Sequence, residues 1–421
     1  MKTLYYTSYK LILMIIERED YIDKIYPFVN KHIIKVLIGP RRSGKSTILK
    51  QIINSLIKDG IPKENIVWMN FELSDYFEID NIQKLEEFIS SKTENVNGKI
   101  YLFFDEIHHV KQFEKTINSF RATLNCSVFI TGSNSKMLSS DITSLLTGRT
   151  ITFEINPFSF DEAIEYLKLG KSKINEETFE DYLKFGGYPL RFEMKDEKSI
   201  RRYLEELYES ILEKDIFTRN ADIEKEKFNR VAKYILVNAG TEFNAQNVAD
   251  YLCHEFGKDY ISCQSVYNYI DKMKKCFLIR EINKYSIPGL KELVTRPKYY
   301  AVDNGFRLIN TNSNDYKPSR FLENIICNEL ISRGYDVYIG KTYKGEVDFV
   351  AMENGKKCFI QVSYYMGNEE TVNREFDAFD PIKDASPKYV LSLDRLDMSR
   401  KGITHINIID FLTHKKDLYL S

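Results

Sequence analysis

The chain has 421 residues, which is enough for two or three domains. Because 43% of the residues are hydrophobic and 13% aromatic, the chain can bury large cores, and intrinsic disorder is excluded as its main state. Sixty Lys and Arg against 61 Asp and Glu give a formal net charge of −1. This balance excludes a molecule that binds polyanions over its whole surface, but it allows a local basic face.

Cysteine spacing and the N-terminal residues bear on localisation. Six cysteines lie far apart without a C-x-x-C pair, which fits neither a zinc ribbon nor a disulfide framework, so we expect reduced thiols in a cytoplasmic protein. Residues 1–14 are interpreted as a tail, and Met14 offers an alternative start. The apolar run there lacks a small-residue cleavage site and turns charged at Glu17, which argues against a signal peptide. No run approaches the ~20 apolar residues of a membrane span.

Between residues 15 and 155, short apolar runs alternate with amphipathic helical stretches. The runs are Ile33–Ile38, Ile66–Phe71, Ile100–Phe104, Val128–Ile130 and Thr150–Ile155. Continuous apolar runs separated by helices indicate buried parallel strands. The sequence therefore predicts an α/β fold whose first domain, residues 15–155, has three layers with a five-stranded parallel sheet.

The strongest motif is the nonapeptide GPRRSGKST at residues 39–47, which fits G-x-x-x-x-G-K-[ST] and lies between an apolar run and a helical segment. In such a loop, backbone N–H groups and the helix N-terminus attract phosphate oxygens. Lys45 is expected to reach the β- and γ-phosphates, and the Ser46 hydroxyl to ligate Mg²⁺. The residues predicted to bind ATP are Gly39, Arg42, Ser43, Gly44, Lys45, Ser46 and Thr47.

A second motif ends the apolar run at residues 100–104 with two acids. Asp105 and Glu106 would emerge at the carboxyl end of a buried strand, where open α/β sheets bind ligands. We expect Asp105 to hold Mg²⁺ through water, and Glu106 to orient the attacking water and act as general base.

Two further residues are weaker candidates for catalysis. Ser133 follows the apolar run Val128–Ile130 and could sense the γ-phosphate or position water, although a Thr-Gly-Ser segment is often only a turn. Arg149 could stabilise the charge that develops on the γ-phosphate, or it could be an ordinary surface arginine.

Helical patterns dominate the middle of the chain. Residues 156–225 are predicted to form a helical linker or lid, and residues 226–310 show three helices followed by a β-hairpin, the order of a winged helix-turn-helix. Ser262–Lys275 would be its recognition helix. Its polar side chains are Gln264, Ser265, Asn268, Lys272, Lys274 and Lys275. Gln264, Asn268 and Lys272 are predicted to contact DNA, and the alternative is a packing or protein-contact module.

With these motifs in place, the chain resembles prokaryotic AAA-type P-loop ATPases, related to the STAND branch, that carry a winged helix and an uncharacterised C-terminal domain. The matching segments are GPRRSGKST, YLFFDEIHHV, TGSNSKML, LLTGR, INPFSFDEA, FGGYPL, LEKDI, YYAVDNGFR, FLENIICNEL and GEVDFV. The resemblance covers nearly the whole chain after residue 14 and implies ATP binding, with hydrolysis a reasonable expectation.

Residues 311–421 resemble restriction-endonuclease-like domains, with Glu323 on a helix and Asp348 on a strand. Active members place two acids and a lysine around Mg²⁺, but here Gln361 and Ser363 stand at the second acid and lysine positions. A neutral amide binds Mg²⁺ weakly, and no cation remains for the phosphate charge. Glu346 could compensate for the acid, and Lys344 or Lys356 for the lysine, but solvated turn lysines are the preferred interpretation of these two residues. The resemblance implies a degenerate domain, so nuclease activity is not expected.

The sequence as a whole predicts an ATPase that uses ATP and Mg²⁺ as a conformational switch coupled to DNA- or protein-binding modules. A homo-oligomer or a protein partner is compatible with this prediction, and a membrane partner is not expected. Two alternatives remain open, namely an ATP-regulated, Mg²⁺-dependent nuclease and a switch that binds ATP without hydrolysing it.

Overall fold

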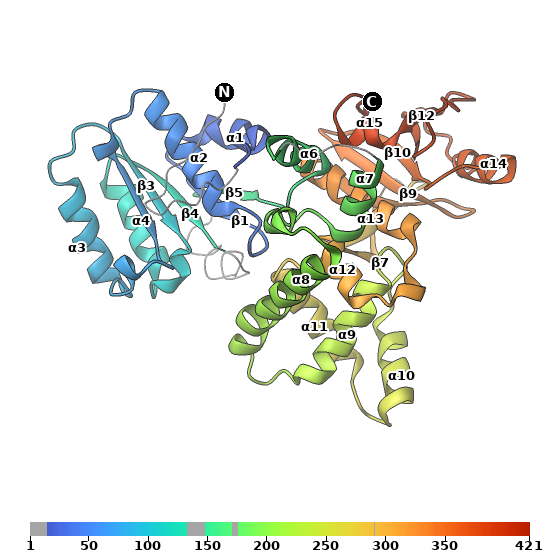
Figure 1. Ribbon diagram of the computed structural model, residues 1–421, viewed down its shortest axis with the longest axis horizontal. Coiled ribbons are helices and arrows are strands. Elements are labelled where there is room, and N and C mark those ends of the chain that lie inside the picture. Colours follow the sequence, from blue (N-terminus) through green and yellow to red (C-terminus); the bar gives the residue numbers. More distant parts are fainter. Residues whose placement is uncertain (1–14, 133–147, 171–175, 290) are drawn as a thin grey trace. The chain divides into compact units, whose positions relative to one another are not determined.

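The computed structural model describes residues 15–132, 148–170, 176–289 and 291–421. The chain divides into two compact units, Met1–Pro157 and Phe158–Ser421, which are described in turn (Figure 1). None of the described helices is both long enough and apolar enough to cross a membrane.

Unit 1 contains a parallel sheet of five strands, as the apolar runs predict. The strands are β1 (Ile34–Ile38), β2 (Ile66–Asn70), β3 (Ile100–Asp105), β4 (Cys126–Thr131) and β5 (Thr150–Glu154). Their order is β2-β3-β4-β1-β5, and every pairing is parallel. Strand β4 therefore lies between β1 and β3, and it separates the two strands that end in the phosphate-binding and acidic motifs.

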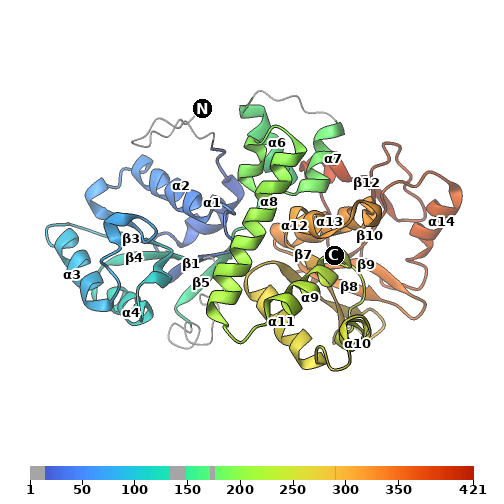
Figure 2. The ribbon, with the colours of Figure 1, turned by 60° about the horizontal axis from the view of Figure 1, so that its bottom comes forward.

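Helices cover both faces of this sheet (Figure 2). They are α1 (Glu19–Ile25) and α2 (Lys45–Lys58) on one face, and α3 (Ile82–Thr93) and α4 (Phe113–Thr123) on the other. Successive residues of a strand face the two helical layers in turn. Phe103 belongs to the core formed with α1 and α2, whereas the ring of Phe104 stacks near Phe120 of α4. This alternation explains why every residue of β3 is buried.

Unit 2 begins with helices. They are α6 (Phe160–Leu169), α7 (Glu176–Phe185), the short 3₁₀ helix η6 (Pro189–Glu193), α8 (Glu197–Ile211) and α12 (Asn304–Asn310), which packs against α7 and α8. A π-helical turn, Leu212–Ile216, continues α8, so this helical segment is α-helical only to Ile211. π-Turns are irregular backbone that periodicity alone does not reveal.

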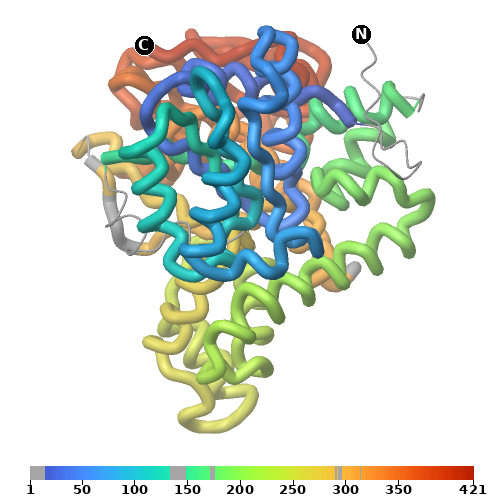
Figure 3. The backbone as a smooth tube through the Cα atoms, turned by 90° about the vertical axis from the view of Figure 1, so that its left-hand side faces the viewer, coloured from blue at the N-terminus to red at the C-terminus, as the bar shows by residue number. Residues whose placement is uncertain are grey.

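Three more helices and a hairpin follow. They are α9 (Lys225–Val237), α10 (Ala245–Phe256), α11 (Cys263–Lys275), β6 (Ile279–Ser286) and β7 (Lys291–Ala301). Within α11, Val266, Tyr269, Ile270 and Met273 are buried, as the sequence predicts. In Figure 3 the yellow helices α9–α11 gather at the opposite end of unit 2 from the C-terminal strands, which are red.

The last part of unit 2 is a sheet of seven strands. Besides β6 and β7 it contains β8 (Asp336–Lys341), β9 (Glu346–Glu353), β10 (Lys356–Val362), β11 (Lys388–Ser392) and β12 (Thr404–Asn407). The order is β12-β11-β10-β9-β8-β6-β7, so the β6–β7 hairpin extends the same sheet. Its helices are α13 (Pro318–Arg333), α14 (Glu369–Asp377) and α15 (Ile408–Leu412). Asn354 and Gly355 form the predicted β9–β10 turn, both with positive φ.

A buried aspartate holds two distant segments of unit 2 together. Asp303 accepts hydrogen bonds from the backbone N–H groups of Gly187, at 2.7 Å, and Gly305, at 2.8 Å. A Cβ atom on Gly187 would lie 2.0 Å from the Phe158 carbonyl oxygen, so this close approach requires glycine. The segments FGGYPL and YYAVDNGFR therefore meet around Asp303 in the fold.

Candidate functional site

The phosphate-binding loop follows β1 and leads into α2. Gly39 and Gly44 have φ values of 139° and 101°, which L side chains rarely adopt. A Cβ atom on Gly39 would also lie 2.2 Å from the Ile155 carbonyl oxygen. Both glycines of the motif are therefore required by the backbone, which curls so that α2 begins at Lys45.

Lys45 is placed inside this loop. The residue is only 5% exposed, and its Nζ donates to the carbonyl oxygens of Gly39, at 3.0 Å, and Pro40, at 2.9 Å. Two carbonyl oxygens of the loop thus hold the ammonium group. Of the other loop residues, Ser43 is buried, Ser46 and Thr47 are half-buried, and Arg42 is exposed.

A threonine joins the two acids at the end of β3. Thr131, at the end of β4, donates from Oγ1 to Asp105 Oδ1 at 2.6 Å and accepts from the Glu106 backbone N–H at 2.9 Å. Burial raises the pKa of Asp105, although hydrogen bonds from Thr131 and Ser46 and the charge of Lys45 counteract this. The interaction with Ser46 connects the acidic motif with the phosphate-binding loop.

Glu106 differs from Asp105 in its backbone conformation and in the side chain that it contacts. Its φ is 55°, in the left-handed region, and its Oε2 lies 3.1 Å from His108 Nδ1. Both side chains are largely buried. Such left-handed backbone is uncommon for residues other than glycine and occurs often at functional sites.

A buried arginine that the sequence did not reveal contacts the loop. Arg18 is 2% exposed and donates from Nη1 to the Ser43 carbonyl oxygen at 2.9 Å, and from Nη2 to the Asn156 carbonyl oxygen at 3.0 Å. It links the phosphate-binding loop to the last residues of unit 1. No spacing rule identifies such a residue, because it precedes β1 and matches no motif.

The structure describes only one of the two weaker candidates for catalysis. Ser133 lies outside the described residues. Arg149 is exposed and donates from Nη1 to Asn118 Oδ1 at 3.0 Å. Thr131, two residues before Ser133, contacts both acids. Thr131 ends the buried strand β4, but its contacts with the acids depend on the order of the strands in the sheet.

The residues at this edge of the sheet fit a magnesium ion. Asp105 Oδ2 is buried and has no hydrogen-bond partner among the described residues. Mg²⁺ is usually bound by one or two protein oxygen ligands, together with substrate phosphates and water. Asp105 and Ser46 offer such a pair, whereas no group of three or more His, Cys, Asp or Glu able to hold a metal occurs within the described residues.

The second group of acids lies in unit 2. Asp348 Oδ2 accepts from the Val362 N–H at 2.8 Å, and burial together with Glu323 raises the pKa of Asp348. Gln361 is also bonded within the protein: its Oε1 accepts from the Asp348 N–H, and its Nε2 donates to Glu375 Oε2 at 2.9 Å. The amide at the second acid position is thus engaged by protein groups.

The charged side chains near this second group of acids are partly paired with one another. Glu346 pairs with Lys284 at 2.7 Å and Lys298 at 3.4 Å, so its carboxylate is already neutralised. Lys344 and Lys356 are exposed. The charge of Lys298 on β7 partly counteracts the rise in the pKa of Asp348.

Comparison with protein families agrees with the first unit's geometry. Residues 31–164 match a family described as an AAA domain, and residues 176–315 match a domain of unknown function (DUF8612). The chain therefore contains an AAA-type P-loop domain. It belongs to one family with an uncharacterized protein of Haemophilus influenzae, with 31% identity over 94% of this chain and 98% of that protein. Uncharacterized protein MJ1544 of Methanocaldococcus jannaschii is 31% identical over 83% of this chain and 79% of its own length.

Solved structures give more distant likenesses. The ORC2 protein of Aeropyrum pernix, in ADPNP–ADP complexes, aligns over 74% of this chain and 91% of its own, with a TM-score of 0.39 and 10% identity. AMPPCP-bound DnaA from Aquifex aeolicus aligns over 61% and 86%, with a TM-score of 0.30 and 13% identity.

Proposed function

We propose that the protein is an ATPase that acts as a nucleotide-driven switch, with its second unit carrying DNA- or protein-binding modules. The observation that supports this most directly is the connection of three parts at one edge of the sheet. Lys45 begins α2, Asp105 ends β3, and Thr131 of β4 joins Asp105 to the backbone of Glu106.

The chemistry assigned to these residues follows from their groups. Lys45 and the loop N–H groups bind the β- and γ-phosphates of ATP, and Ser46 and Asp105 hold Mg²⁺, which neutralises phosphate charge when bound. Glu106 accepts the proton of the attacking water, and His108 limits the orientations of the Glu106 carboxylate. Arg149 remains our proposal for the cation that stabilises the transition state, and Ser133 for a γ-phosphate sensor.

Arg18 supports the proposal of a switch. A change in the loop backbone at Ser43 alters the acceptor of Arg18, which also bonds Asn156, the residue before Pro157. Asn156 donates in turn from its N–H to the Tyr21 hydroxyl at 3.1 Å. Nucleotide binding can therefore affect the backbone where the chain leaves unit 1.

A basic segment favours nucleic acid as the partner of unit 2. From α9 through β7, residues 225–301 contain thirteen Lys and Arg and eight Asp and Glu, a net charge of +5 in a chain whose total is −1. We interpret α9–α11 with β6 and β7 as a winged helix whose α11 reads DNA. Gln264 and Asn268 are exposed there, whereas Lys274 and Lys275 pair with Glu281 and Asp271.

Equilibrium binding of a fluorescent ATP analogue tests the proposed nucleotide site. Lys45→Ala should abolish tight binding, because Lys45 supplies the phosphate contact deep in the loop. Lys50→Ala, an exposed change on the same helix, is the matched control and should bind as the wild type does. Equal affinity in Lys45→Ala and wild type would contradict the assignment.

Duplex DNA labelled for fluorescence anisotropy tests the second unit. Lys272→Glu combined with Asn268→Ala should weaken binding and reduce its salt dependence, since a phosphate contact is lost. Lys198→Glu changes an exposed lysine on α8 and should leave DNA binding unchanged. Binding that is absent in the wild type at low salt would favour a protein partner.

A further inference from the structure

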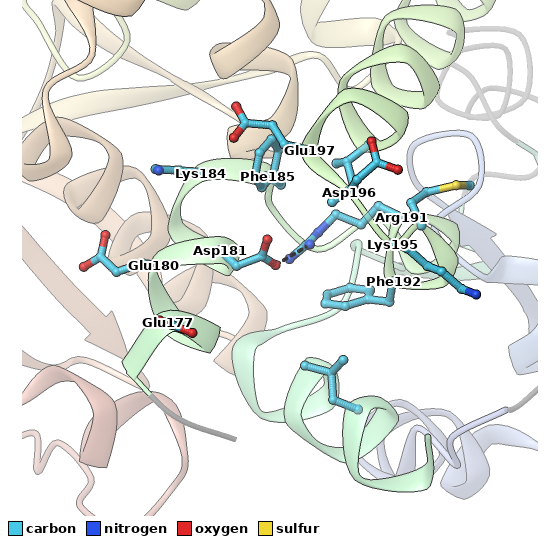
Figure 4. A pocket seen from close by; sticks show the side chains of 13 residues that line it. Glu177, Glu180, Asp181, Lys184, Phe185, Arg191, Phe192, Lys195, Asp196 and Glu197 are labelled. Carbon is cyan, nitrogen blue, oxygen red and sulfur yellow. Dashed lines mark hydrogen bonds and ion pairs between the residues drawn. The ribbon is translucent and has the colours of Figure 1, made fainter. Parts of the chain in front are cut away.

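Two buried cationic residues of the chain have different surroundings. In unit 2, Arg191 is 1% exposed and pairs with Asp181 at 2.6 Å, beside a cavity bordered by α7, η6 and the beginning of α8 (Figure 4). In unit 1, Lys35 of β1 is fully buried, but it forms no ion pair with an acid in the part of the chain that the structure describes. A buried charge without an opposite charge is costly, because it loses its hydration and gains no ion pair in return.

Uncharged groups surround the Lys35 amine. Its Nζ donates to Ser127 Oγ at 2.7 Å and to the Lys31 carbonyl oxygen at 3.3 Å. The same nitrogen lies 4.5 Å from the centre of the Phe129 ring. A neutral amine has two N–H donors, which the two oxygens satisfy. A protonated amine has three, so one N–H is left without an oxygen acceptor among the described residues.

The other titratable groups around Lys35 do not compensate for its charge. Lys99, which precedes β3, repels a positive charge at Lys35, and Arg121 of α4 is a further cation that acts on the Cys126 thiol of β4. Cys126 would attract Lys35 only as a thiolate, but burial raises the pKa of this thiol to about 11. Tyr101 of β3 is also neutral near pH 7, because burial raises its pKa further.

Lys35 therefore changes its charge near neutral pH. Burial, together with the charge of Lys99, lowers the pKa of Lys35 from 10.5 to about 7. The unfolded chain has no such environment, so it holds this proton more tightly than the folded unit does.

The amine also joins three segments at the beginning of β1. Ser127 of β4, which accepts from Lys35, donates from Oγ to the Val29 carbonyl oxygen at 2.5 Å. Val29 and Lys31 both precede β1, the strand that leads into the phosphate-binding loop. The charge state of Lys35 thus acts where β1, β4 and the preceding segment meet.

We propose that Lys35 is a pH-sensitive element of unit 1, whose protonation destabilises the folded unit and whose deprotonation stabilises it. Below about pH 7 the amine is charged in both states, and the folded unit carries the full cost of burying it. Above this pH the folded unit holds a neutral amine, so the cost decreases as the pH rises toward 10.5. This proposal does not depend on ATP binding or hydrolysis.

Urea unfolding of the full chain, followed by tryptophan fluorescence, tests the proposal. Trp68 of β2 is the only tryptophan of the chain, so its emission reports on unit 1. Lys35→Met removes the charge and keeps an unbranched side chain. The unfolding constant of the wild type, divided by that of Lys35→Met, should be constant from pH 5 to about 6.5. From about pH 7.5 to 9 this ratio should fall about tenfold per pH unit.

Two further variants separate the charge from other effects of the substitution. Lys35→Gln keeps an N–H donor without a titratable charge, so the ratio measured with it should change with pH as it does for Lys35→Met. Lys115→Met changes an exposed lysine of α4, and its ratio should stay constant with pH. A ratio for Lys35→Met that stays constant or rises between pH 7.5 and 9 would overturn the proposal. Failure of both Lys35 variants to fold would overturn it as well, because removal of the buried charge should not destabilise unit 1.

Discussion

Thr131 is the residue whose side chain connects the two acids of the proposed catalytic site. Its hydroxyl donates to Asp105 and accepts from the Glu106 N–H, and the residue is fully buried. One hydroxyl therefore sets the orientation of the proposed metal ligand and the backbone of the proposed base. It acts through these two residues, so it is a positioning residue.

Replacing Thr131 should separate catalysis from binding. Thr131→Val keeps the shape but leaves the Glu106 N–H and Asp105 Oδ1 without their partner, so turnover should fall about 10- to 100-fold while affinity for ATP changes little. Steady-state phosphate release and nucleotide binding measure the two effects. Thr131→Ser restores the hydroxyl and should recover most of the rate. If Thr131→Ser is as slow as Thr131→Val, the hydroxyl is not what matters.

Asp303 gives the turn at Gly186–Gly187 a pH-dependent stability. Burial raises the pKa of Asp303 from 3.8 to about 6. The folded state thus holds this proton more tightly than the unfolded state. The contribution is fully present below about pH 4 and is lost as the pH rises to about 6 and above, at a cost on the order of 3 kcal/mol.

Asp303→Asn tests this element directly. The amide has one acceptor oxygen for two N–H donors, so the variant should unfold more readily by about 1–3 kcal/mol. The advantage of the wild type over the variant should be largest near pH 4 and smaller at pH 7, because only the wild type titrates at this position. Denaturant unfolding of both proteins at the two pH values gives the difference. An advantage that increases with pH contradicts the raised pKa.

We expect the domain that carries the acids of β9 and α13 to bind DNA or a protein partner without cleaving nucleic acid. Gln361 is bonded to Asp348 and Glu375, and Glu346 is paired with Lys284 and Lys298. Supercoiled and single-stranded DNA incubated with Mg²⁺ or Mn²⁺, with and without ATP, should therefore remain intact. Nicking that is lost in Asp348→Ala but kept in Lys45→Ala would instead establish an ATP-regulated nuclease.

Sequence patterns predicted the strands of unit 1 well, because buried parallel strands are continuous apolar runs. Strand β7, which spans Lys291–Ala301, is harder to recognise in the sequence. Pro297 lowers the strand signal, but it lies where the register with β6 shifts, and Arg296 has a φ of 55°. Proline is tolerated at such irregular positions.

The candidate site could be predicted where residue type and spacing along the chain together define a motif. The loop glycines and Lys45 belong to one such motif, and Asp105 and Glu106 to another. Arg18 and Thr131 could not be found in that way, because their roles depend on the order of strands in the sheet. Only when β4 lies between β1 and β3 does Thr131 reach both acids.

At the scale of the whole molecule, the question is whether ATP hydrolysis requires several copies of the chain to assemble. Arg149 is exposed, so it can reach a neighbouring copy of the chain. If it completes the site of a neighbour, hydrolysis per chain should rise with protein concentration. Phosphate release over a wide dilution series measures this. A rate per chain that stays constant argues against action between subunits.

The distribution of charge along the chain is also a property of the whole molecule. The net charge of +5 over residues 225–301 is offset by the rest of the chain, which is why the total of −1 gave no indication of a basic face. A nucleotide-driven switch with such a segment would couple ATP turnover to an anionic partner. This coupling depends first on whether the chain hydrolyses ATP.

Phosphate release by wild type and Glu106→Gln is therefore the most direct test of the account. Both proteins should bind ATP with similar affinity, since Glu106 is assigned to the attacking water and not to the phosphates. The wild type should turn over ATP, and Glu106→Gln should be slower by about 10²-fold or more, as expected for loss of a positioned base. Hydrolysis by Glu106→Gln at the wild-type rate, or no hydrolysis by the wild type, would contradict the account.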